Sequence, residues 1–346
     1  MVSEKKKCSF IGTHNGQFHC DEALACYMLK LLPEFENCQI KRSRDPAVLN
    51  ECDIIVDVGA MYDHSKMRYD HHQKEFKTTM KDVHAHMDFT TKLSSAGLVY
   101  AHYGIDIMKK IYSGETGLSH IKNDDLKQLY SKVYQNFVEE IDAVDNGINV
   151  SDSDKVNYRV TTTISSRVGF LNPKWNEESS EKIQFERFEK AMQLVGTEFV
   201  ERVLHYARVW LPGREIVKTA MEKRLKFHES GQIVVFEDIC PPWKDHLYNL
   251  EKELNLLEDS RRIYYVIYQD SNGGWRVQCV PMAEGSFNSR LPLPENWRGV
   301  RDDKLSEISQ IPQCVFVHSS GFIGGNLTYE GALKMAVISL NQLNVN

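Results

Sequence analysis

The sequence has no long hydrophobic run. Hydrophobic residues make up 42% of the 346 positions, yet the longest clean apolar stretches, such as Val234–Phe236, have only the length of a strand. A transmembrane helix needs roughly 20 predominantly apolar residues. We therefore expect no membrane-spanning segment and no membrane partner. With 26% charged residues, the composition is that of a globular chain long enough for two domains.

An excess of positive charge is also absent. The chain has 42 Lys and Arg residues against 48 Asp and Glu residues, a formal charge of −6. This balance argues against a histone-like role in coating DNA, which needs a broad positive surface, but it permits a local basic groove. The basic cluster at residues 5–7 precedes no apolar segment, so we expect neither a secretory signal nor a clear presequence. The cluster is either a solvated terminus or a weak nuclear address.

Paired cysteine motifs are missing as well. The chain has eight cysteines, and none of them forms a C-x-x-C pair. Zinc-ribbon and iron–sulfur sites are thereby excluded. Without a secretory signal, the cysteines are expected to be reduced thiols of an intracellular protein, not a disulfide framework.

The first half of the chain predicts alternating strands and helices. A short apolar run at Cys8–Gly12 is typical of a buried strand, and Gln39–Arg42 and Asp53–Val58 are predicted as two further strands. A helical stripe at 21–32 separates the first two, and further helices are predicted at 94–103 and 126–144. Strands and helices in this succession favour βαβ units and a parallel sheet.

The second half changes in character after a long predicted helix at 183–211, which we expect Pro212-Gly213 to end. Predicted strands and a closing helix follow at Ile233–Phe236, Arg262–Tyr268, Trp275–Val280, Cys314–Val317 and Tyr329–Leu343. We predict an α/β protein with a parallel-sheet domain over residues 1–175 and a helical connector over 176–228. A smaller α+β domain over 229–346 would complete it, with a ligand in the cleft between the domains.

Titratable residues gather where the predicted strands end. His14, His19 and Asp21 lie between the first strand and the first helix, Asp57 closes another strand, and Asp70-His71-His72 follows. The carboxyl ends of parallel strands meet at one edge of a sheet. Imidazole and carboxylate ligands without thiolate suit Mn²⁺, Fe²⁺, Zn²⁺ or Mg²⁺. A single His-His pair is more often structural or exposed, but three such groups favour a metal site.

The Asp70-His71-His72 motif after a strand that ends in Asp57 resembles the DHH phosphoesterase superfamily of single-strand exonucleases, oligoribonucleases and family II inorganic pyrophosphatases. The sequence is still more similar to the Myg exonuclease family (melanocyte-proliferating-gene proteins). The similar segments cover nearly the whole chain: Thr13–Ala25, Asp57–Gln73, Ser94–Tyr100, Ile141–Ile148, Ile164–Trp175, Trp210–Val217, Pro241–Leu247, Leu293–Gly299 and Phe316–Ala336. The resemblance implies a metal-dependent 3′–5′ RNA exonuclease of nucleus and mitochondrion that acts on single-stranded RNA with metal-activated water.

The resemblance also implies a set of metal ligands, namely His14, His19, Asp21, Asp57, His71 and Asp145. Asp142 is the alternative for the last position, and Asp57 is placed to bridge two divalent ions. Catalysis is assigned to Asp70, His71 and His72, of which some would orient ligands or protonate the leaving oxygen. His19 stands where other branches of the superfamily carry Asp, which favours softer ions. Two divalent ions are expected, with Mn²⁺ favoured and Mg²⁺ or Zn²⁺ possible, and the His19 imidazole supports a divalent site more firmly than it supports Mn²⁺ as the occupant.

A glycine-rich segment near the end of the chain is the second candidate site. It follows a predicted strand and precedes the last predicted helix, as expected for a loop that approaches a phosphate. Such a loop alone more often shapes a turn, but the resemblance implies a substrate-binding role for His318, Gly321, Gly324, Gly325, Arg298 and Arg301. Aromatic–basic neighbours at Trp243, Trp275 and Trp297 either stack on bases or belong to the core.

Two other functions are compatible with these residues. The chain could be a hydrolase of a small phosphate, such as pyrophosphate or a cyclic dinucleotide, or a non-catalytic RNA-binding regulator that retains the DHH fold. The sequence does not indicate an oligomeric state, and a cytoplasmic location is also compatible with it.

Overall fold

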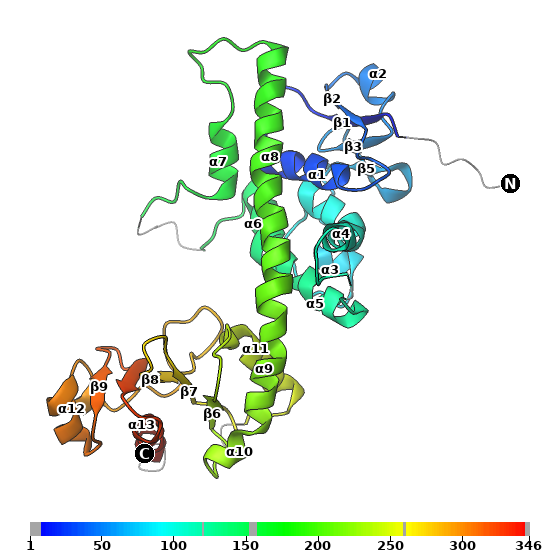
Figure 1. Cartoon of the computed structure of the whole chain (residues 1–346). Coiled ribbons are helices and arrows are strands. Elements are labelled where there is room, and N and C mark those ends of the chain that lie inside the picture. The colour runs from blue at the N-terminus through cyan, green and yellow to red at the C-terminus, as the bar shows by residue number, and fades with distance from the viewer. Residues whose placement is uncertain (1–7, 120, 152–157, 259–260, 343–346) are drawn as a thin grey trace. The chain divides into compact units, whose positions relative to one another are not determined.

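The computed structural model describes residues 8–119, 121–151, 158–258 and 261–342. The predicted basic cluster at residues 5–7 lies outside this part of the chain. The fold is α/β, with two mixed five-stranded sheets. Each sheet belongs to one of two compact units, Met1–Arg208 and Val209–Asn346 (Figure 1).

The sheet of the first unit has the strand order β2-β1-β3-β5-β4. The strands β1 (Phe10–Thr13), β2 (Gln39–Arg42), β3 (Ile54–Val56) and β5 (Arg68–Tyr69) run parallel, as predicted. The edge strand β4 (Tyr62–Asp63) is antiparallel to β5, so the prediction of a parallel sheet is wrong at this edge. The short 3₁₀ turn η1 (His64–Lys66) joins β4 to β5, and parallel neighbours would need a long crossover.

Helix α1 (Cys20–Lys30) is buried along nearly its whole length. It packs against α4 (Ser95–Ser113) and α8 (Glu181–His205), and it also contacts β3 (Figure 1). Because α1 starts directly after the loop that follows β1, its first turn lies at the carboxyl edge of the sheet. This position brings the polar residues of that turn into the interior.

The remaining helices of the first unit are short. They are α2 (Pro46–Leu49), α3 (Met80–Val83), α5 (Asn123–Val133), the π-helical turn η2 (Tyr134–Val138), α6 (Glu139–Asp145) and α7 (Ile164–Phe170). The helix predicted at 126–144 corresponds to α5, η2 and α6 in succession. It ends one residue before Asn146-Gly147, and Gly147 has a positive φ of 68°. Glycine adopts this conformation at little cost and commonly ends a helix.

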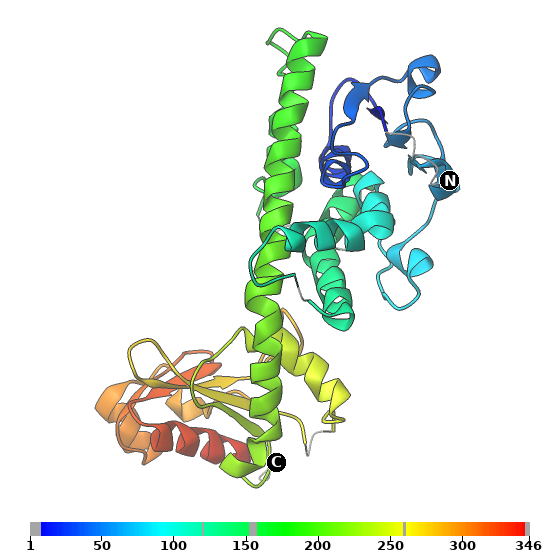
Figure 2. The same ribbon diagram turned by 45° about the vertical axis from the view of Figure 1, so that its right-hand side comes forward.

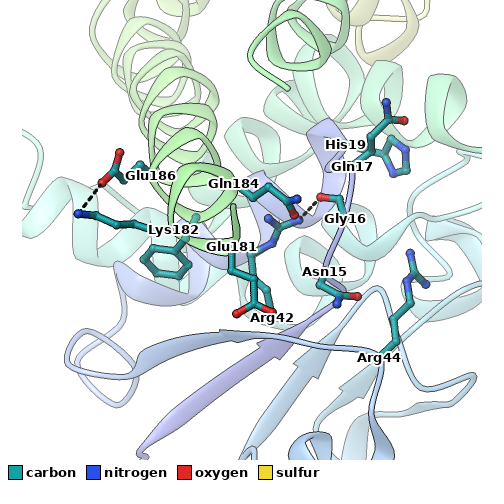
Figure 3. A pocket seen from close by; sticks show the side chains of 11 residues that line it. Asn15, Gly16, Gln17, His19, Arg42, Arg44, Glu181, Lys182, Gln184 and Glu186 are labelled. Atoms are coloured by element: carbon teal, nitrogen blue, oxygen red, sulfur yellow. Dashed lines mark hydrogen bonds and ion pairs between the residues drawn. The ribbon is translucent and has the colours of Figure 1, made fainter. Parts of the chain in front are cut away.

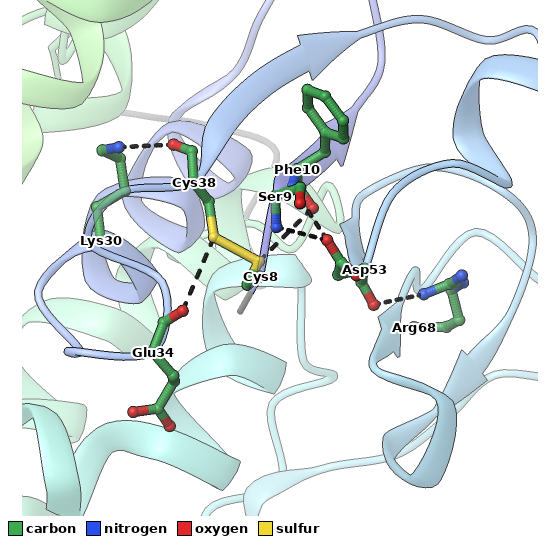
Figure 4. The surroundings of a disulfide bond; sticks show 8 residues. All are labelled: Cys8, Ser9, Phe10, Lys30, Glu34, Cys38, Asp53 and Arg68. Carbon is green, nitrogen blue, oxygen red and sulfur yellow. Dashed lines mark hydrogen bonds between the residues drawn. A yellow bond between two sulfur atoms is a disulfide. The ribbon is translucent and has the colours of Figure 1, made fainter. Parts of the chain in front are cut away.

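A disulfide joins Cys8 to Cys38 at the start of the first two strands (Figure 4). The amide of Gln39 donates to the carbonyl of Ser9 at 2.9 Å, so the strands begin side by side and the two Cα atoms lie 5.9 Å apart. The prediction that all cysteines are reduced is therefore wrong for this pair. No local sequence pattern predicts this pairing, because the two residues meet only after β1 and β2 are aligned.

The helical connector differs from the prediction at Pro212. After α8, the π-helical turn η3 (Tyr206–Trp210) leads without an intervening loop into α9 (Leu211–Glu222). Pro212 lies in the first turn of α9, the part of a helix that tolerates proline best. The wider π turn immediately before it is a common way to accommodate such a change within a helix. Pro212-Gly213 therefore does not end the helical segment.

The sheet of the second unit has the order β6-β7-β8-β10-β9. Its strands are β6 (Ile233–Phe236), β7 (Tyr265–Gln269), β8 (Trp275–Cys279), β9 (Cys314–Val317) and β10 (Ile323–Asn326). Helix α11 (Trp243–Glu253) lies between β6 and β7 in the chain, and these two strands are parallel while the others are antiparallel. The predicted hairpin between β7 and β8 is confirmed.

Helices cover both faces of this second sheet. One face packs against α12 (Asp302–Ser309) and α13 (Tyr329–Asn341), and Figure 2 shows α13 running along the sheet. On the other face, α9 and α11 pack over β6 and β7. The short α10 (Arg224–Phe227) and η4 (Glu295–Trp297) complete the unit. The last helix was predicted to reach Leu343, which lies outside the described residues.

Among the helices of the described ranges, none is long and apolar enough to cross a membrane.

Candidate metal centre

A cluster of histidines and carboxylates lies at the carboxyl edge of the first sheet. Every residue predicted to bind metal contributes to it: His14, His19, Asp21, Asp57, His71 and Asp145. His14 follows β1, Asp57 follows β3, and His71 follows β5. The remaining ligands come from the start of α1 and the end of α6. Segments far apart in the sequence thus meet because parallel strands end at one edge.

Asp57 lies at the centre of the cluster. Its Oδ2 is 3.2 Å from Nε2 of His14, and its Oδ1 is 3.2 Å from Nε2 of His71. Its backbone has a φ of 58°, a left-handed conformation that Asp tolerates better than most residues. The amide of Asp57 still donates to the carbonyl of Tyr69 at 3.0 Å, so the carboxylate is held by the sheet. The two oxygens of Asp57 therefore face different histidines.

His14 is buried between two carboxylates. Its Nδ1 lies 3.0 Å from the carbonyl of Asn15, which directs Nε2 toward Asp57 and toward Oε1 of Glu22 at 3.0 Å. Glu22 is fully buried and also accepts from the amide of His19 at the start of α1. Glu22 is not among the ligands predicted from the sequence. Its position three residues after the N-cap His19 matches the spacing of a capping box, and this signal places its side chain at the helix start.

His71 faces the other side of the cluster. Its Nε2 lies 3.0 Å from Oδ2 of Asp145 and 4.0 Å from Oδ2 of Asp21. Its Nδ1 is 3.3 Å from the amide oxygen of Asn146, whose Nδ2 donates to the carbonyl of Asp142. Asn146 was not predicted either, and it fixes the ring of His71 from behind.

Asp21 is oriented by the start of α4. Its Oδ2 accepts from the hydroxyl of Ser95 at 2.7 Å and from the amide of Ser95 at 3.3 Å. Its Oδ1 is buried and has no hydrogen-bond partner among the residues that the structure describes. Ser95 thus orients Asp21 through Oδ2, the oxygen that also faces His71 at 4.0 Å.

Asp142 has a different environment from Asp145. Its Oδ1 accepts from the hydroxyl of Ser94 at 2.7 Å and from the amide of Gly97 at 3.0 Å, and its Oδ2 accepts from Tyr134 at 2.9 Å. These contacts satisfy free N–H groups in the first turn of α4. Of the two candidate acids, Asp145 contacts the cluster and Asp142 supports the helix behind it.

Asp70 and His72 form a pair at the rim. Oδ1 of Asp70 lies 2.7 Å from Nδ1 of His72, and its Oδ2 accepts from the amide of Ala60. Asp70 is buried, whereas the side chain of His72 is 60% exposed. The carboxylate of Asp70 is hence directed at His72, and the imidazole of His72 reaches solvent.

The carboxylates of the cluster require positive charge. Burial disfavours the charged form of His14, yet the hydrogen bonds to Asp57 and Glu22 outweigh it and raise the pKa of His14 to about 10. Burial acts likewise on His71, and the carboxylates of Asp145 and Asp57 raise its pKa to about 10. Burial raises the pKa of Glu22 to about 8. In the metal-free chain, protons on the two histidines supply the charge that a cation would otherwise bring.

The donor atoms fit a divalent metal. Three groups of residues each place their ligand atoms within 4.8 Å of one another: His14, His19, Glu22 and Asp57; Asp57, His71 and His72; and His19, Asp21 and Asp145. Oδ1 of Asp21, Oδ1 of Asp57 and Nε2 of His71 are buried without a partner of hydrogen-bond geometry. Such buried unsatisfied atoms are rare in proteins, and a bound ion would satisfy them together. The nitrogen and oxygen donors suit Mn²⁺, Zn²⁺ or Mg²⁺.

In the second unit, the residues predicted to bind substrate lie around the β9–β10 hairpin. His318 is exposed in the turn and accepts from the amide of Ser320 at 3.2 Å. Gly321 follows with a φ of 74°, and a Cβ there would lie 2.7 Å from Nε of Arg298. Arg301 is exposed, and its guanidinium lies 5.8 Å from the ring of Phe316.

The expected glycine-rich loop is in part a strand. Gly324 and Gly325 lie inside β10, where they pair with β8 and β9, and both are buried. A Cβ on Gly325 would come within 2.5 Å of Nη1 of Arg276, so this glycine leaves room for the guanidinium. The start of α13 is capped by Thr328, whose side chain accepts from Gly331. The prediction that Gly324 and Gly325 form a loop at a helix start is therefore wrong.

The predicted base-stacking tryptophans belong largely to the core. Trp243 and Trp297 are 4% and 3% exposed, so neither offers a free ring face. Trp275 packs on Tyr329 at a ring distance of 5.1 Å. For these residues the core alternative holds, because large aromatic side chains bury well.

The fold and the cluster together define a two-unit α/β protein whose first unit carries a buried histidine–carboxylate centre suited to divalent metal. Residues 10–340 match the model of the family named MYG1_exonuc, described as an uncharacterised protein family, UPF0160. The chain belongs to this MYG1 family, which confirms the resemblance found in the sequence.

Relatives of this family are similar over nearly their whole length. The MYG1 protein of Caenorhabditis elegans is 51% identical over 330 residues, which cover 95% of this chain and 94% of the relative. The MYG1 exonuclease of Rattus norvegicus is 50% identical, with 96% and 84% covered. The MYG1 exonuclease of Homo sapiens is 49% identical, with 96% and 86% covered.

Proposed function

We propose that this chain is a metal-dependent 3′–5′ exonuclease that degrades single-stranded RNA. The names of the rat and human relatives support an exonuclease. The observation that carries the proposal is the position of Asp57, whose two carboxylate oxygens face His14 and His71 at 3.2 Å each. A carboxylate shared in this way suits a pair of ions, the arrangement that phosphodiester hydrolysis commonly uses.

The cluster divides into two halves around Asp57. On one side of Asp57, an ion would be held by His14, His19 and Glu22, whose donor atoms lie close together. On the other side, an ion would be held by His71 together with Asp21 and Asp145, which lie near its Nε2. When bound, the pair supplies Lewis-acid stabilisation of phosphate charge and lowers the pKa of water. We propose Mn²⁺ as the ion because carboxylates suit it, with Zn²⁺ as the alternative that the histidines of the site suit.

His72 would act as the proton donor to the leaving oxygen. Its side chain is 60% exposed, and Asp70 holds its Nδ1 at 2.7 Å. This hydrogen bond raises the pKa of His72 above its ordinary value, which favours the protonated ring that a proton donor needs. Asp70 would then be a positioning residue, and His72 the group that transfers the proton.

The second unit would bind the RNA backbone. His318, Arg298 and Arg301 supply positive or hydrogen-bonding groups around the β9–β10 turn, and Gly321 keeps the turn tight. We propose these residues as the substrate-binding set, together with Gly324 and with Gly325, which makes room for Arg276. The division into catalytic domain (1–175), connector (176–228) and substrate domain (229–346), and the kinship with DHH phosphoesterases, belong to the same proposal.

The proposal is tested with the purified chain loaded with Mn²⁺ and RNA labelled at either end. A 3′–5′ exonuclease shortens 5′-labelled RNA in single-nucleotide steps and releases only mononucleotide from 3′-labelled RNA. The His72→Gln variant is expected to reduce the rate about 10²–10⁴-fold, as loss of a general acid does. Lys127→Gln, on the exposed surface of α5, serves as the control.

The other functions predict different results. Hydrolysis of pyrophosphate or a cyclic dinucleotide without RNA cleavage would favour a small-phosphate hydrolase. RNA binding without cleavage under Mn²⁺, Mg²⁺ or Zn²⁺ would favour a non-catalytic regulator. Location in nucleus and mitochondrion is part of the proposal as well, and fluorescence microscopy of the tagged full chain tests it.

A further inference from the structure

A pocket of about 1030 Å³ lies in the first unit beside the candidate metal centre (Figure 3). It is lined by the loop between β1 and α1, by two arginines at the end of β2, and by the first turns of α8. Its volume is at the upper end of the roughly 300–1,000 Å³ that small-molecule sites span. His19 belongs both to this pocket and to two of the metal-binding groups. A ligand in the pocket would therefore adjoin the metal centre.

Arg42 fixes the wall between the pocket and the metal centre. Its Nε donates to the carbonyl of His14 at 3.1 Å, and its Nη2 donates to the carbonyl of Gly16 at 2.9 Å (Figure 3). Its guanidinium also lies 4.6 Å from the ring centre of Phe188. These contacts hold the loop that carries His14 and His19, so the pocket keeps its shape next to them.

Arg44 supplies an available positive charge. It is exposed and forms no ion pair or side-chain hydrogen bond with any described residue. Figure 3 shows it on the side of the pocket where His19 lies. An unpaired guanidinium binds phosphate oxygens in a bidentate manner, better than the other side chains of this pocket can.

The side formed by α8 has a different chemistry. Glu181 is exposed there, and Glu186 lies 3.9 Å from Lys182, so this side offers little net positive charge to a phosphate. Gln184 brings an amide and Phe185 a half-buried ring to the same side. Amide groups match the edges of a nucleobase, and an aromatic ring provides a face on which a base can stack. The pocket is thus suited to a phosphate at one end and a base at the other.

We propose that this pocket is a subsite for one nucleotide of the substrate, with its phosphate on Arg44 and its base on the Phe185 side. The inference rests on the proposed exonuclease function and adds a contact surface in the first unit to it. It assigns recognition of a nucleotide to residues that lie beside His19 and outside the metal-binding groups.

Calorimetric titration with adenosine 5′-monophosphate and with ribose 5-phosphate, in the presence of Mn²⁺, tests the subsite. Arg44→Ala is expected to weaken both ligands by about tenfold or more, since it removes a charged phosphate contact. Phe185→Ala is expected to weaken only the nucleotide, because ribose 5-phosphate has no base. Arg202→Ala, an exposed arginine farther along α8, is the matched control and should bind both ligands like the wild type.

Wild-type protein that does not bind the nucleotide, or an Arg44→Ala variant that binds it equally well, would overturn the subsite. The RNA ladder assay separates this result from failure of the proposed function. Nucleotide binding that depends on Arg44 and Phe185, without RNA cleavage, would keep the subsite and refute the exonuclease. RNA cleavage with unchanged binding in both variants would do the reverse.

Discussion

Two neighbouring serines at the start of α4 allow a sharp test of how the metal centre is held. Ser95 donates its hydroxyl to Asp21 at 2.7 Å, and Ser94 donates its hydroxyl to Asp142 at the same distance. Both serines are fully buried. Replacing either by Ala removes one hydrogen bond to a buried carboxyl group. Of the two carboxyl groups, Asp21 belongs to the histidine–carboxylate cluster and Asp142 does not.

The Ser95→Ala variant should lose metal affinity. A hydrogen bond to a charged group contributes about 1.5–3 kcal/mol, and loss of an outer-sphere partner typically weakens metal binding about 10–100-fold. Only the amide of Ser95, at 3.3 Å, would remain on Oδ2 of Asp21, so this carboxylate would turn more freely. We therefore expect the Ser95→Ala variant to bind Mn²⁺ about 10–100-fold more weakly than the wild type.

The Ser94→Ala variant is the matched comparison. It removes a hydrogen bond to Asp142, which caps the first turn of α4. The Ser94→Ala variant should therefore have a lower melting temperature than the wild type and a smaller loss of Mn²⁺ affinity than Ser95→Ala. Isothermal titration with Mn²⁺ and thermal unfolding of both variants separate the two effects. Equal Mn²⁺ affinity in Ser95→Ala and wild type would refute the assignment of Ser95 as the residue that positions Asp21.

Three further predictions concern the same region. Asp70→Asn removes the carboxylate that raises the pKa of His72, so the alkaline limb of the rate profile should move to lower pH; an unchanged limb would contradict the role of His72. Gly97→Ala would place a Cβ about 2.3 Å from Oδ2 of Asp142, and we expect a loss of about 1–3 kcal/mol in urea unfolding; wild-type stability would show that the carboxyl can move aside. The metal-free protein should be less stable at about pH 9 than at about pH 6. The raised pKa of His14, about 10 against 6.5, gives stability that is present below 6.5 and lost as the pH rises toward 10. Burial raises the pKa of Asp142 to about 7, so loss of its proton as the pH rises also destabilises the folded state. The two effects therefore have the same sign. Calorimetry should also show Mn²⁺ stabilising the protein more at the higher pH, because the ion replaces protons; a metal-free protein that gains stability with pH would contradict the charge balance of the cluster.

The sequence predicted the parts of the fold that depend on local pattern. The bounds of β2, β6 and β9 agree with the predicted strands. Short β-branched and apolar runs define β6 and β9, whereas Ile40 is the one apolar residue of β2. The gathering of His14, Asp57 and His71 could also be foreseen. Each follows a parallel strand, and such strands end at one edge of a sheet.

Features set by packing between distant segments escaped prediction. Glu22 enters the cluster only because α1 is buried on nearly all sides, so a position that would be a polar surface in an isolated helix faces inward. Ser95 meets Asp21 only once α4 lies against α1. The Cys8–Cys38 pair depends on the alignment of β1 with β2.

In the second unit, the presence of glycines alone led to a wrong prediction of local structure. Gly324 and Gly325 suggested a loop, since glycine lacks a strand-forming side chain. In the structure they lie in β10, because the sheet needs room for Met335 on one side and for Arg276 on the other. The requirement comes from neighbours on other elements, and local composition does not record it.

The central claim is that Asp57 is shared by a pair of divalent ions. Anomalous diffraction at the manganese edge, from crystals of the full chain grown with Mn²⁺, tests it most directly. We expect two peaks roughly 3.5–4 Å apart, one on each side of the Asp57 carboxylate, with His14 near one and His71 near the other. A single peak remote from Asp57, or no peak in the cluster at saturating Mn²⁺, would contradict the account.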